Sequence, residues 1–571
     1  MTQEHPAAQA PRTSTPLDAI ADGFVASYAQ LSPSFASAVG IPGYDGLTDD
    51  LSVQGYGQRH DLAKATLDSL ATADTVDDVD AVTLAAMRER LGLQVELFEA
   101  GEVMSALNNI ASEVQGLRDV YDNMPTDTVD QWANIASRMA KLPWAMDGLM
   151  ESLSYEAARG NVAAIRQVTE CARQARELAA EDSFFTSFVA GASAVDQGQG
   201  VGPALQADLD DAAEKAREAY SKLAHFLEQD LAPQAPQADA VGRERYARAS
   251  RYFLGAQVDL DETYEWGIEE LARVVARQTQ VAAEIAGPGA SVEDAVAALD
   301  ANPAYTLHGT DQLKAWMQKT SDEAIANLSG THFVIEGPSR VCECMIAPTQ
   351  TGGIYYTPPS DDFSRPGRMW WSVPPGVTEF QTWREKTTVY HEGVPGHHLQ
   401  CAAAVAAKDT LNSWRRLMSW CSGHGEGWAL YAEQLMADLG YMDDPGDMLG
   451  MLDGQRLRAT RVVFDIGMHL GKKAPAAWGG QVWTPEVAWD FLSANVAMNE
   501  GFRRFEFNRY LGWPGQAPSY KIGQRLWEQI RDADQAAAAA SGKAWDAKAF
   551  HTRALNLGGV PLDVLRTAMA A

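Results

Sequence analysis

The sequence predicts a large, mainly α fold with one small antiparallel β-sheet. Apolar residues recur three and four positions apart through most of residues 17–228 and 246–328, which is the spacing of amphipathic helices. Between residues 331 and 375 this spacing gives way to short β-prone runs divided by Gly and Pro, and from Glu379 onward it returns. Hydrophobic residues make up 46% of the 571 residues, which is enough for an extensive buried core.

The predicted elements begin after a segment rich in Pro, Ala, Thr and Gln, residues 1–15, which we expect to be a mobile tail. The helical pattern that follows breaks at residues 40–43, 191–202 and 231–242, where Gly, Pro, Ala and polar residues accumulate. The clearest predicted helices in this region cover residues 81–97, 129–142, 146–158 and 162–179.

Long helices are expected again over residues 246–285, and they end at a Gly-Pro-Gly sequence at residues 287–289. Ser291 is placed to cap the next helix, with Asp294 at the reciprocal position of a capping box. A further helix is predicted over residues 310–328.

Four β-prone runs come next, and we expect them to form the small antiparallel sheet: residues 331–335, 340–346, 353–357 and 369–373. Cys342 and Cys344 are two positions apart on one of these strands and are expected to pack on the same face. The remainder of the chain is predicted to be helical to near Ala571, and the alanine run at residues 536–540 favours a helix.

The composition excludes several classes of partner. A net charge of −30 and a pI near 4.7 argue against nucleic acids and anionic membranes, because phosphate groups would be repelled. The five cysteines are odd in number and lack CxxC spacing, so we expect a reducing compartment. The N-terminal residues have neither a basic region nor an apolar run, and no stretch approaches 20 apolar residues. The sequence therefore predicts a cytoplasmic protein without a secretory signal or membrane span, and it does not indicate an oligomeric state.

The centre of the functional prediction is the sequence HEGVPGHH, residues 391–398. It lacks the HExxH spacing that places two zinc-binding imidazoles on one helix face. On a regular helix the residue six positions after His391 points away from it, and the seventh lies roughly 10 Å further along the axis. His391 and a later histidine can therefore share one metal ion only if the helix is broken between them.

Gly393, Pro395 and Gly396 provide residues that can break the helix. Looping out two residues would carry His397 back to the place of the second histidine of HExxH. The alternative is a simple helix end at Pro395, followed by histidines without a metal-binding role. The spacing alone leaves both interpretations open.

The motif resembles HExxPGHH of a bacterial family labelled domain of unknown function 885. That family is similar to the helical gluzincin metallopeptidases, such as angiotensin-converting enzyme, thimet oligopeptidase and the Taq-type carboxypeptidases. These relatives carry a Gly directly before the second ligand, so the resemblance favours His397 over His398. It implies one zinc ion held by His391 and His397, with Glu392 as the general base.

Two further segments extend the resemblance. GHGEGWALYAE, residues 423–433, is similar to the family's EGWALYAE motif, which implies that Glu426 is the third zinc ligand. Glu433 lies two turns later on the same helix face and is expected either to support a ligating histidine or to be a solvated carboxylate. PGQAPSYKIG, residues 514–523, resembles PGQAxSYKIG, and Tyr520 is our candidate hydrogen-bond donor to an oxyanion.

The sequence also suggests groups for substrate binding. Arg509, Gln516 and Lys521 are candidates for binding a substrate carboxylate, although the Gly/Pro loop around Gln516 also fits a turn that caps the next helix. Tyr355, with Tyr356, lies on a predicted strand that would bind the substrate backbone in the zinc peptidases; the alternative is that both tyrosines only pack.

A polar stripe follows at positions i, i+4 and i+8 of one predicted helix: Arg461, Asp465 and His469. We expect this stripe to line a cleft, with Arg461 binding substrate, Asp465 supporting the site, and His469 or His398 aiding Tyr520. The alternative is a buried salt bridge between Arg461 and Asp465 that stabilises the packing.

Taken together, the resemblance implies a two-lobed helical metallopeptidase-like fold with a deep cleft. It places an N-terminal helical lobe at residues 16–330 and a catalytic lobe at 331–571, with the sheet at 331–375 and the metal-site helices at 380–571. The expected activity is zinc-dependent hydrolysis of short peptides or peptide-like amides, with a carboxypeptidase or dipeptidase favoured. The alternatives are an amidohydrolase acting on a non-peptide metabolite and a non-catalytic helical protein with a structural or vestigial metal site.

Overall fold

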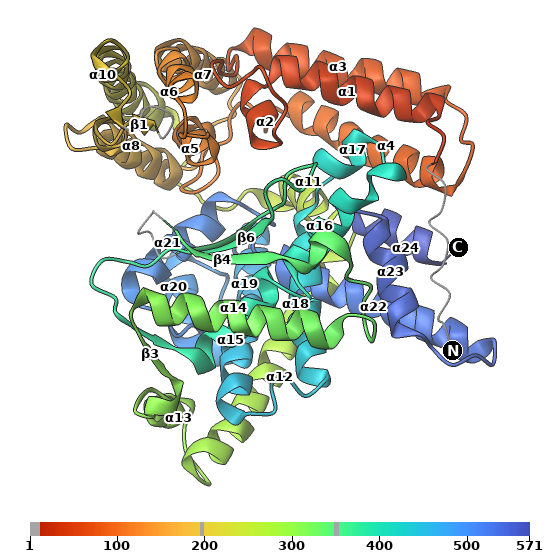
Figure 1. The fold of residues 1–571 in the computed structure, drawn as a ribbon. Helices are drawn as coiled ribbons and strands as arrows, with labels where there is room; N and C mark the ends of the chain where they lie inside the picture. The colour runs from red at the N-terminus through yellow and green to blue at the C-terminus, as the bar shows by residue number, and fades with distance from the viewer. Residues whose placement is uncertain (1–11, 195–198, 348–352, 571) are drawn as a thin grey trace.

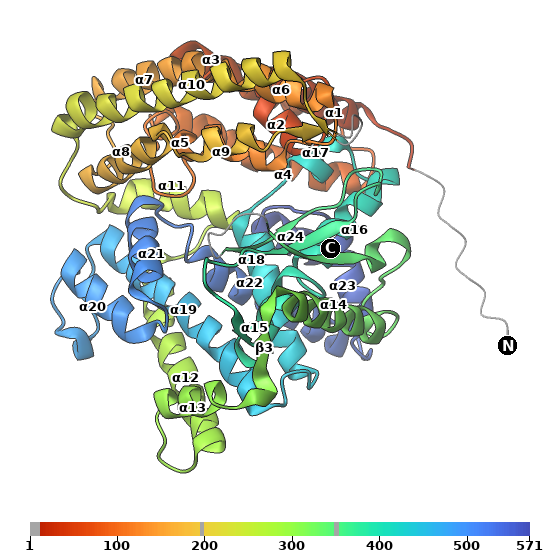
Figure 2. The same cartoon turned by 60° about the vertical axis from the view of Figure 1, so that its left-hand side comes forward.

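The computed structural model describes residues 12–194, 199–347 and 353–570, which are mainly α-helical, as predicted (Figure 1). The first ten helices form the upper part of the molecule in Figure 2. They are α1 Pro16–Leu31, α2 Pro33–Ala38, α3 Val53–Ala71, α4 Asp78–Glu99, α5 Glu113–Asp119, α6 Val129–Met139, α7 Leu142–Ala157, α8 Ile165–Ala179, α9 Phe184–Ala190 and α10 Pro203–Phe226. Strands β1 Ser193–Ala194 and β2 Gln199–Gly200 form a short antiparallel pair among them.

The middle of the chain connects this part to the site. Its helices are α11 Gly242–Leu254, α12 Leu260–Ala286, α13 Val292–Asp300 and α14 Gly309–Leu328. Helix α12 ends directly before the Gly-Pro-Gly sequence, and Ser291 and Asp294 form the predicted capping box of α13. The strands are β3 Thr306–His308, β4 Cys342–Ile346, β5 Ile354–Thr357, β6 Gly367–Trp371 and β7 Glu379–Gln381.

The C-terminal part is helical, as expected. Its helices are α15 Thr382–Glu392, α16 His397–Ala406, α17 Ser413–Leu417, α18 Ser422–Asp438, α19 Pro445–Leu470, α20 Pro485–Asn495, α21 Glu500–Gly512, α22 Ser519–Ala540, α23 Ala547–Asn556 and α24 Leu562–Ala570. Helix α19 packs along α12 and α15, and α18 packs closely along α22. None of the helices in the described ranges is both long and apolar enough to span a bilayer.

Two strand predictions are wrong. The three-stranded sheet has the order β4-β6-β5 and is mixed, because β4 runs parallel to β6 while β5 runs antiparallel to it. Residues 331–335 form a tight turn instead of a strand, since the amide of Gly330 donates to the carbonyl of Phe333 at 2.8 Å. Cys342 and Cys344 are both buried on one face of β4, as predicted.

The predicted mobile tail is only partly described, because residues 1–11 lie outside the described residues. The remaining four residues are held in place. Arg12 forms ion pairs with Asp18, Asp77 and Asp80, and Thr15 caps the first helix. These contacts join residues 12–15 to the first helix and to Asp77 and Asp80.

Among the described residues, buried apolar side chains gather in three clusters. One lies within residues 51–231, a small one joins α12, α13, α15 and α19, and the largest joins helices α1, α3 and α4 to residues 246–569. Tyr246, Leu254 and Tyr264 belong to the largest cluster together with Trp428 and Trp527. The apolar packing therefore crosses residue 330, where the sequence predicts a boundary between lobes.

Candidate metal centre

The histidine-rich motif contains the helix break that a shared metal site requires. Helix α15 ends at Glu392 and α16 begins at His397, with a four-residue turn between them. Inside the turn the amide of Gly396 donates to the carbonyl of Tyr390 at 3.0 Å, and the amide of His398 donates to the carbonyl of Gly393 at 3.1 Å. These bonds fold the chain back so that the two helices meet at an angle.

The turn is tight enough to require glycine at position 396. A Cβ atom there would lie 1.9 Å from the carbonyl oxygen of His391, which no side chain tolerates. The Val394–Pro395 peptide bond is cis. The indole Nε1 of Trp428 donates to the carbonyls of Pro395 and Gly396, at 2.9 and 3.2 Å. Helix α18 therefore stabilises the turn through the side chain of Trp428.

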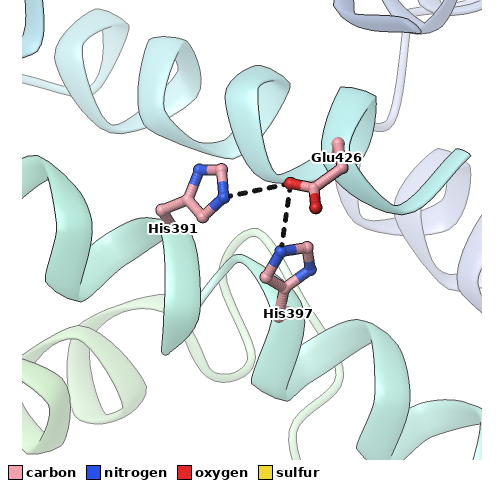
Figure 3. Close-up of side chains that lie close together, drawn as sticks. All are labelled: His391, His397 and Glu426. Carbon is pink, nitrogen blue, oxygen red and sulfur yellow. Dashed lines mark ion pairs between the residues drawn. The ribbon is translucent and has the colours of Figure 1, made fainter. Parts of the chain in front are cut away.

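Three side chains from α15, α16 and α18 converge in front of this turn (Figure 3). Oε2 of Glu426 lies 3.3 Å from Nε2 of His391 and 3.5 Å from Nε2 of His397. The two imidazole rings are nearly perpendicular, with centroids 4.9 Å apart. The three ligand atoms all lie within 4.8 Å of one another, so one ion placed among them is within reach of each.

The chemistry of this cluster suits a zinc ion. Two imidazole nitrogens and one carboxylate oxygen are a common zinc donor set. Oε2 of Glu426 is buried without a hydrogen-bond partner in the described part of the chain. Burial alone would raise the pKa of Glu426, but the two histidines hold it well below its usual value. The carboxylate therefore remains charged and available to a cation.

A second carboxylate, that of Glu433, orients His391 through its other ring nitrogen, Nδ1. Its Nδ1 lies 2.7 Å from Oε1 of the buried Glu433, whose other oxygen accepts a hydrogen bond from Thr387. Burial opposes the charged form of His391, but Glu426 and Glu433 raise its pKa to about 10. The carboxylates of Glu426 and Glu433 thus surround this ring with negative charge, which favours binding of a cation at the cluster. Glu433 is not the solvated carboxylate of the alternative interpretation.

Glycines explain how Glu426 and Tyr520 come together. A Cβ on Gly427 would lie 2.4 Å from the carbonyl carbon of Gly523, and one on Gly523 would lie 2.2 Å from the carbonyl oxygen of Gly423. Helices α18 and α22 can approach this closely only because these positions lack side chains. Because of this close approach, Tyr520, the second residue of α22, lies on the wall of the same cavity as Glu426.

The cluster forms part of the wall of a cavity of about 770 Å³. Glu392 lies on this wall, and burial raises the pKa of its carboxyl group. Burial and the nearby Glu426 raise the pKa of Tyr520, so its hydroxyl keeps its proton at neutral pH. Other predicted residues on the wall are Tyr355, Tyr356 and Arg461.

His398 faces away from the cluster. Its Nδ1 lies 2.9 Å from the hydroxyl of Tyr356, and its Nε2 lies 2.9 Å from the carbonyl of Ser339. Both ring nitrogens are therefore engaged with neighbouring segments of the protein. Of the two adjacent histidines, only His397 is placed with His391 and Glu426.

The polar stripe of α19 is divided between the cavity and the interior. Arg461 lines the cavity, but its ion pair is with Glu506 at 2.8 Å, so the predicted alternative pair with Asp465 is wrong. Asp465 is buried and accepts hydrogen bonds from Tyr246 and from the amide of Gly515. The three positions lie on one helix, but different neighbours cover each of them.

His469 and the candidate carboxylate-binding residues lie mostly in the interior. His469 is 2.9 Å from the carbonyl of Tyr510 and is not on the cavity wall. Arg509 pairs with Glu506 and donates to Gln516 at 2.6 Å. Lys521 pairs with Glu270 at 2.8 Å. The structure does not bring Arg509, Gln516 or Lys521 to the cavity wall, because partners inside the protein engage them.

Trp420 and Arg458 are among the residues on the cavity wall that the sequence interpretation did not single out. Trp420 is 49% exposed there, and its ring centroid lies 6.4 Å from that of His397. Arg458 lies three positions before Arg461 on α19, and this spacing is a signal that could have identified it. Nothing in the local sequence marks Trp420.

Comparisons with known proteins agree with this fold. A family model described as "Bacterial protein of unknown function (DUF885)" matches residues 33–569. No curated protein matches the chain. A solved structure of a "putative lipoprotein" from Colwellia psychrerythraea is similar with a TM-score of 0.82 and 21% identity, covering 97% of this chain and 98% of the other. A "putative lipoprotein of unknown function" from Shewanella oneidensis gives 0.72 and 16%, covering 98% and 100%.

Proposed function

The chain belongs to this DUF885 family, and we propose that it is a zinc-dependent hydrolase of peptide or amide bonds, related to the helical gluzincin metallopeptidases. The observation that most supports the proposal is the convergence of His391, His397 and Glu426, whose ligand atoms lie within 4.8 Å of one another on a cavity wall. Two histidines and one carboxylate leave a fourth position open, which is typical of catalytic rather than structural zinc sites.

These three residues would hold the ion, which would supply Lewis-acid activation of a water molecule near neutral pH. Glu392 directly follows a proposed ligand in sequence and lies on the cavity wall, and these two facts support its carboxylate as the group that accepts the proton of that water. The same carboxyl group then returns the proton to the leaving amine. Burial raises the pKa of Glu392 and so favours this return.

Tyr520 supplies a hydrogen-bond donor on the wall of the same cavity as Glu392. Its hydroxyl is protonated at neutral pH, and the guanidinium carbon of Arg461 lies 4.9 Å from its ring centroid. A donor aimed at the scissile carbonyl oxygen stabilises the negative charge that develops there. Arg461 is itself held by Glu506 and Tyr510, so it serves to position Tyr520.

The cavity and its sheet suit a short peptide. A volume of about 770 Å³ lies within the usual range for sites that enclose a small molecule. Strand β5 is at one edge of the three-stranded sheet and contributes Ile354, Tyr355 and Tyr356 to the wall. An extended substrate backbone can pair with such an edge as an additional strand.

The proposal is tested by measuring bound zinc in purified protein and screening it against mixtures of dipeptides, tripeptides and longer peptides. We expect one zinc per chain and hydrolysis that a chelator abolishes and added zinc restores. Glu392→Gln, assayed in parallel, controls for contaminating peptidases. Stoichiometric zinc without hydrolysis of any amide substrate would contradict the enzymatic proposal, and absence of zinc would contradict the metal site.

A further inference from the structure

Four of the described residues on the cavity wall are arginines, and three of them have partners within the protein. Arg461 pairs with Glu506, and Arg416 pairs with Asp361. Arg415 is buried and donates to the hydroxyl of Thr83 and to the carbonyl of Leu557. These three guanidinium groups have partners that hold their positions without a ligand.

Arg458 is the exception. It has no hydrogen bond and no ion pair within 4.0 Å in the described part of the chain, and its buried Nε lacks a partner. The side chain runs back along α19 and covers Gly454, where a Cβ atom would lie 2.7 Å from Nη1 of Arg458. The absence of a side chain at position 454 thus makes room for the guanidinium against the helix.

None of the carboxylates near Arg458 forms an ion pair with it. Its charge acts on Glu392, Glu433 and Asp453, but none of them lies within ion-pair distance of it. Glu433 is held by His391 and Thr387, and Asp453 lies 3.9 Å from Arg384. Glu392 is the proposed base. An unpaired guanidinium on the wall of a cavity is a strong site for a carboxylate, which it can bind through two parallel hydrogen bonds.

We propose that Arg458 binds the C-terminal carboxylate of the substrate, which makes the protein a carboxypeptidase or dipeptidase. This inference rests on the proposed hydrolase function. Arg458 and Glu392 line the same cavity. A carboxylate bound to Arg458 therefore lies in the cavity that holds the reacting bond, and we expect the bond cleaved to be the last one of the peptide. Arg458, which has no partner among the described residues, takes the carboxylate-binding role that the sequence suggests for Arg509, Gln516 and Lys521.

Two matched probes test this assignment without turnover: the phosphinic analogue of the dipeptide Ala-Phe with a free carboxylate, and the same compound as its carboxamide. Binding to the zinc-loaded protein is measured by calorimetry. We expect the wild-type protein to bind the carboxylate about 10- to 100-fold more tightly than the carboxamide, which is the usual strength of a charged hydrogen-bonded pair.

Arg458→Gln should reduce this ratio to near one by weakening only the carboxylate probe. The control Arg416→Gln alters an arginine of the same wall that is paired with Asp361, and it should retain the wild-type ratio. Arg458→Lys keeps the charge but not the two parallel bonds, so an intermediate ratio is expected. Thermal unfolding shows whether each variant is folded, and Arg458→Lys replaces the glutamine variant if that variant is not.

The assignment would be overturned by a ratio near one in the wild type, by a ratio that persists in Arg458→Gln, or by equal weakening of both probes in that variant. Binding of neither probe would overturn it as well. Hydrolysis is measured on the same samples. A protein that distinguishes the probes through Arg458 but hydrolyses no peptide contradicts only the proposed function, whereas one that hydrolyses free and amidated peptides equally contradicts only the role of Arg458.

Discussion

Nδ1 of His391 lies 2.7 Å from Oε1 of Glu433, so a carboxylate on α18 orients a ring on α15. The contact leaves Nε2 of His391 directed at Glu426, since one ring cannot offer the same nitrogen to both carboxylates. Such supporting carboxylates raise the basicity of a ligating histidine and restrict its rotation.

Glu433→Gln should weaken zinc binding by about 10- to 100-fold while leaving the fold intact. The amide keeps the size of the carboxylate but removes its charge and one acceptor. Affinity is measured by competition with a chelator of known zinc affinity. Asp438→Asn, an exposed carboxylate on the same helix, is the matched control. Equal zinc affinity in the Glu433 variant and the control would remove Glu433 from the site.

Glu392→Gln and Glu426→Ala should separate the base from the ligand. The first keeps all three proposed ligands, so we expect full zinc content and no measurable turnover. The second removes one ligand, so zinc content should fall. Elemental analysis and hydrolysis assays on both variants check this. Turnover by Glu392→Gln, or unchanged zinc in Glu426→Ala, would contradict the respective roles.

Tyr520→Phe should lower kcat by about 100- to 1000-fold, the usual effect of losing one oxyanion donor. Because the ring that faces Arg461 remains, zinc content and thermal stability should stay at the wild-type level. Steady-state kinetics on the best substrate of the peptide screen compare kcat and KM of the variant with those of the wild type. A change confined to KM would show that Tyr520 binds substrate and does not stabilise developing charge.

Gly396→Ala should disrupt the turn between α15 and α16. A Cβ atom 1.9 Å from the carbonyl oxygen of His391 forces the backbone to move, and we expect a loss of about 1–3 kcal/mol in unfolding free energy together with weaker zinc binding. Gly23→Ala is the control, because its exposed position on α1 has open space and alanine favours helices. Denaturant unfolding measures the free energy of unfolding of both variants, and zinc titration measures their zinc affinity. Values for Gly396→Ala equal to those of Gly23→Ala would contradict the prediction.

Asp465 should make the protein less stable as the pH rises towards neutrality. Burial raises the pKa of this carboxyl group from 3.8 to about 7 in the folded chain. Its contribution to stability is therefore complete below about pH 3.8 and is lost as the pH rises through 7. Oδ2 of Asp465 is buried without a hydrogen-bond partner among the described residues, so no donor stabilises the charged carboxylate at that oxygen.

Asp465→Asn removes this titration while keeping the acceptor of Tyr246 and Gly515 at Oδ1. We expect the stability difference between variant and wild type to change by up to about 1.4 kcal/mol per pH unit between pH 4 and 7, in favour of the variant at the higher pH. Urea unfolding at several pH values measures this difference. Parallel stability curves for the two proteins would contradict the raised pKa.

Much of the fold was predictable because it depends on neighbours along the chain. Helix α14, the capping box of Ser291 and the end of α12 before its Gly-Pro-Gly sequence follow from periodicity and local backbone preferences. The mixed pairing of β4, β6 and β5 was not predictable in this way, since strand order depends on contacts between distant segments.

By itself, the sequence determined that a helix must break between His391 and His397, because Gly393, Pro395 and Gly396 intervene. Only the tertiary structure decided which histidine turns toward Glu426 and which toward Tyr356. It also decided which arginines find partners: Arg461 meets Glu506 on another helix, while Arg458, one turn earlier, meets none among the described residues. The reason is physical: backbone preferences act over a few residues, but the partner of a buried charge is set by whichever helix packs opposite it.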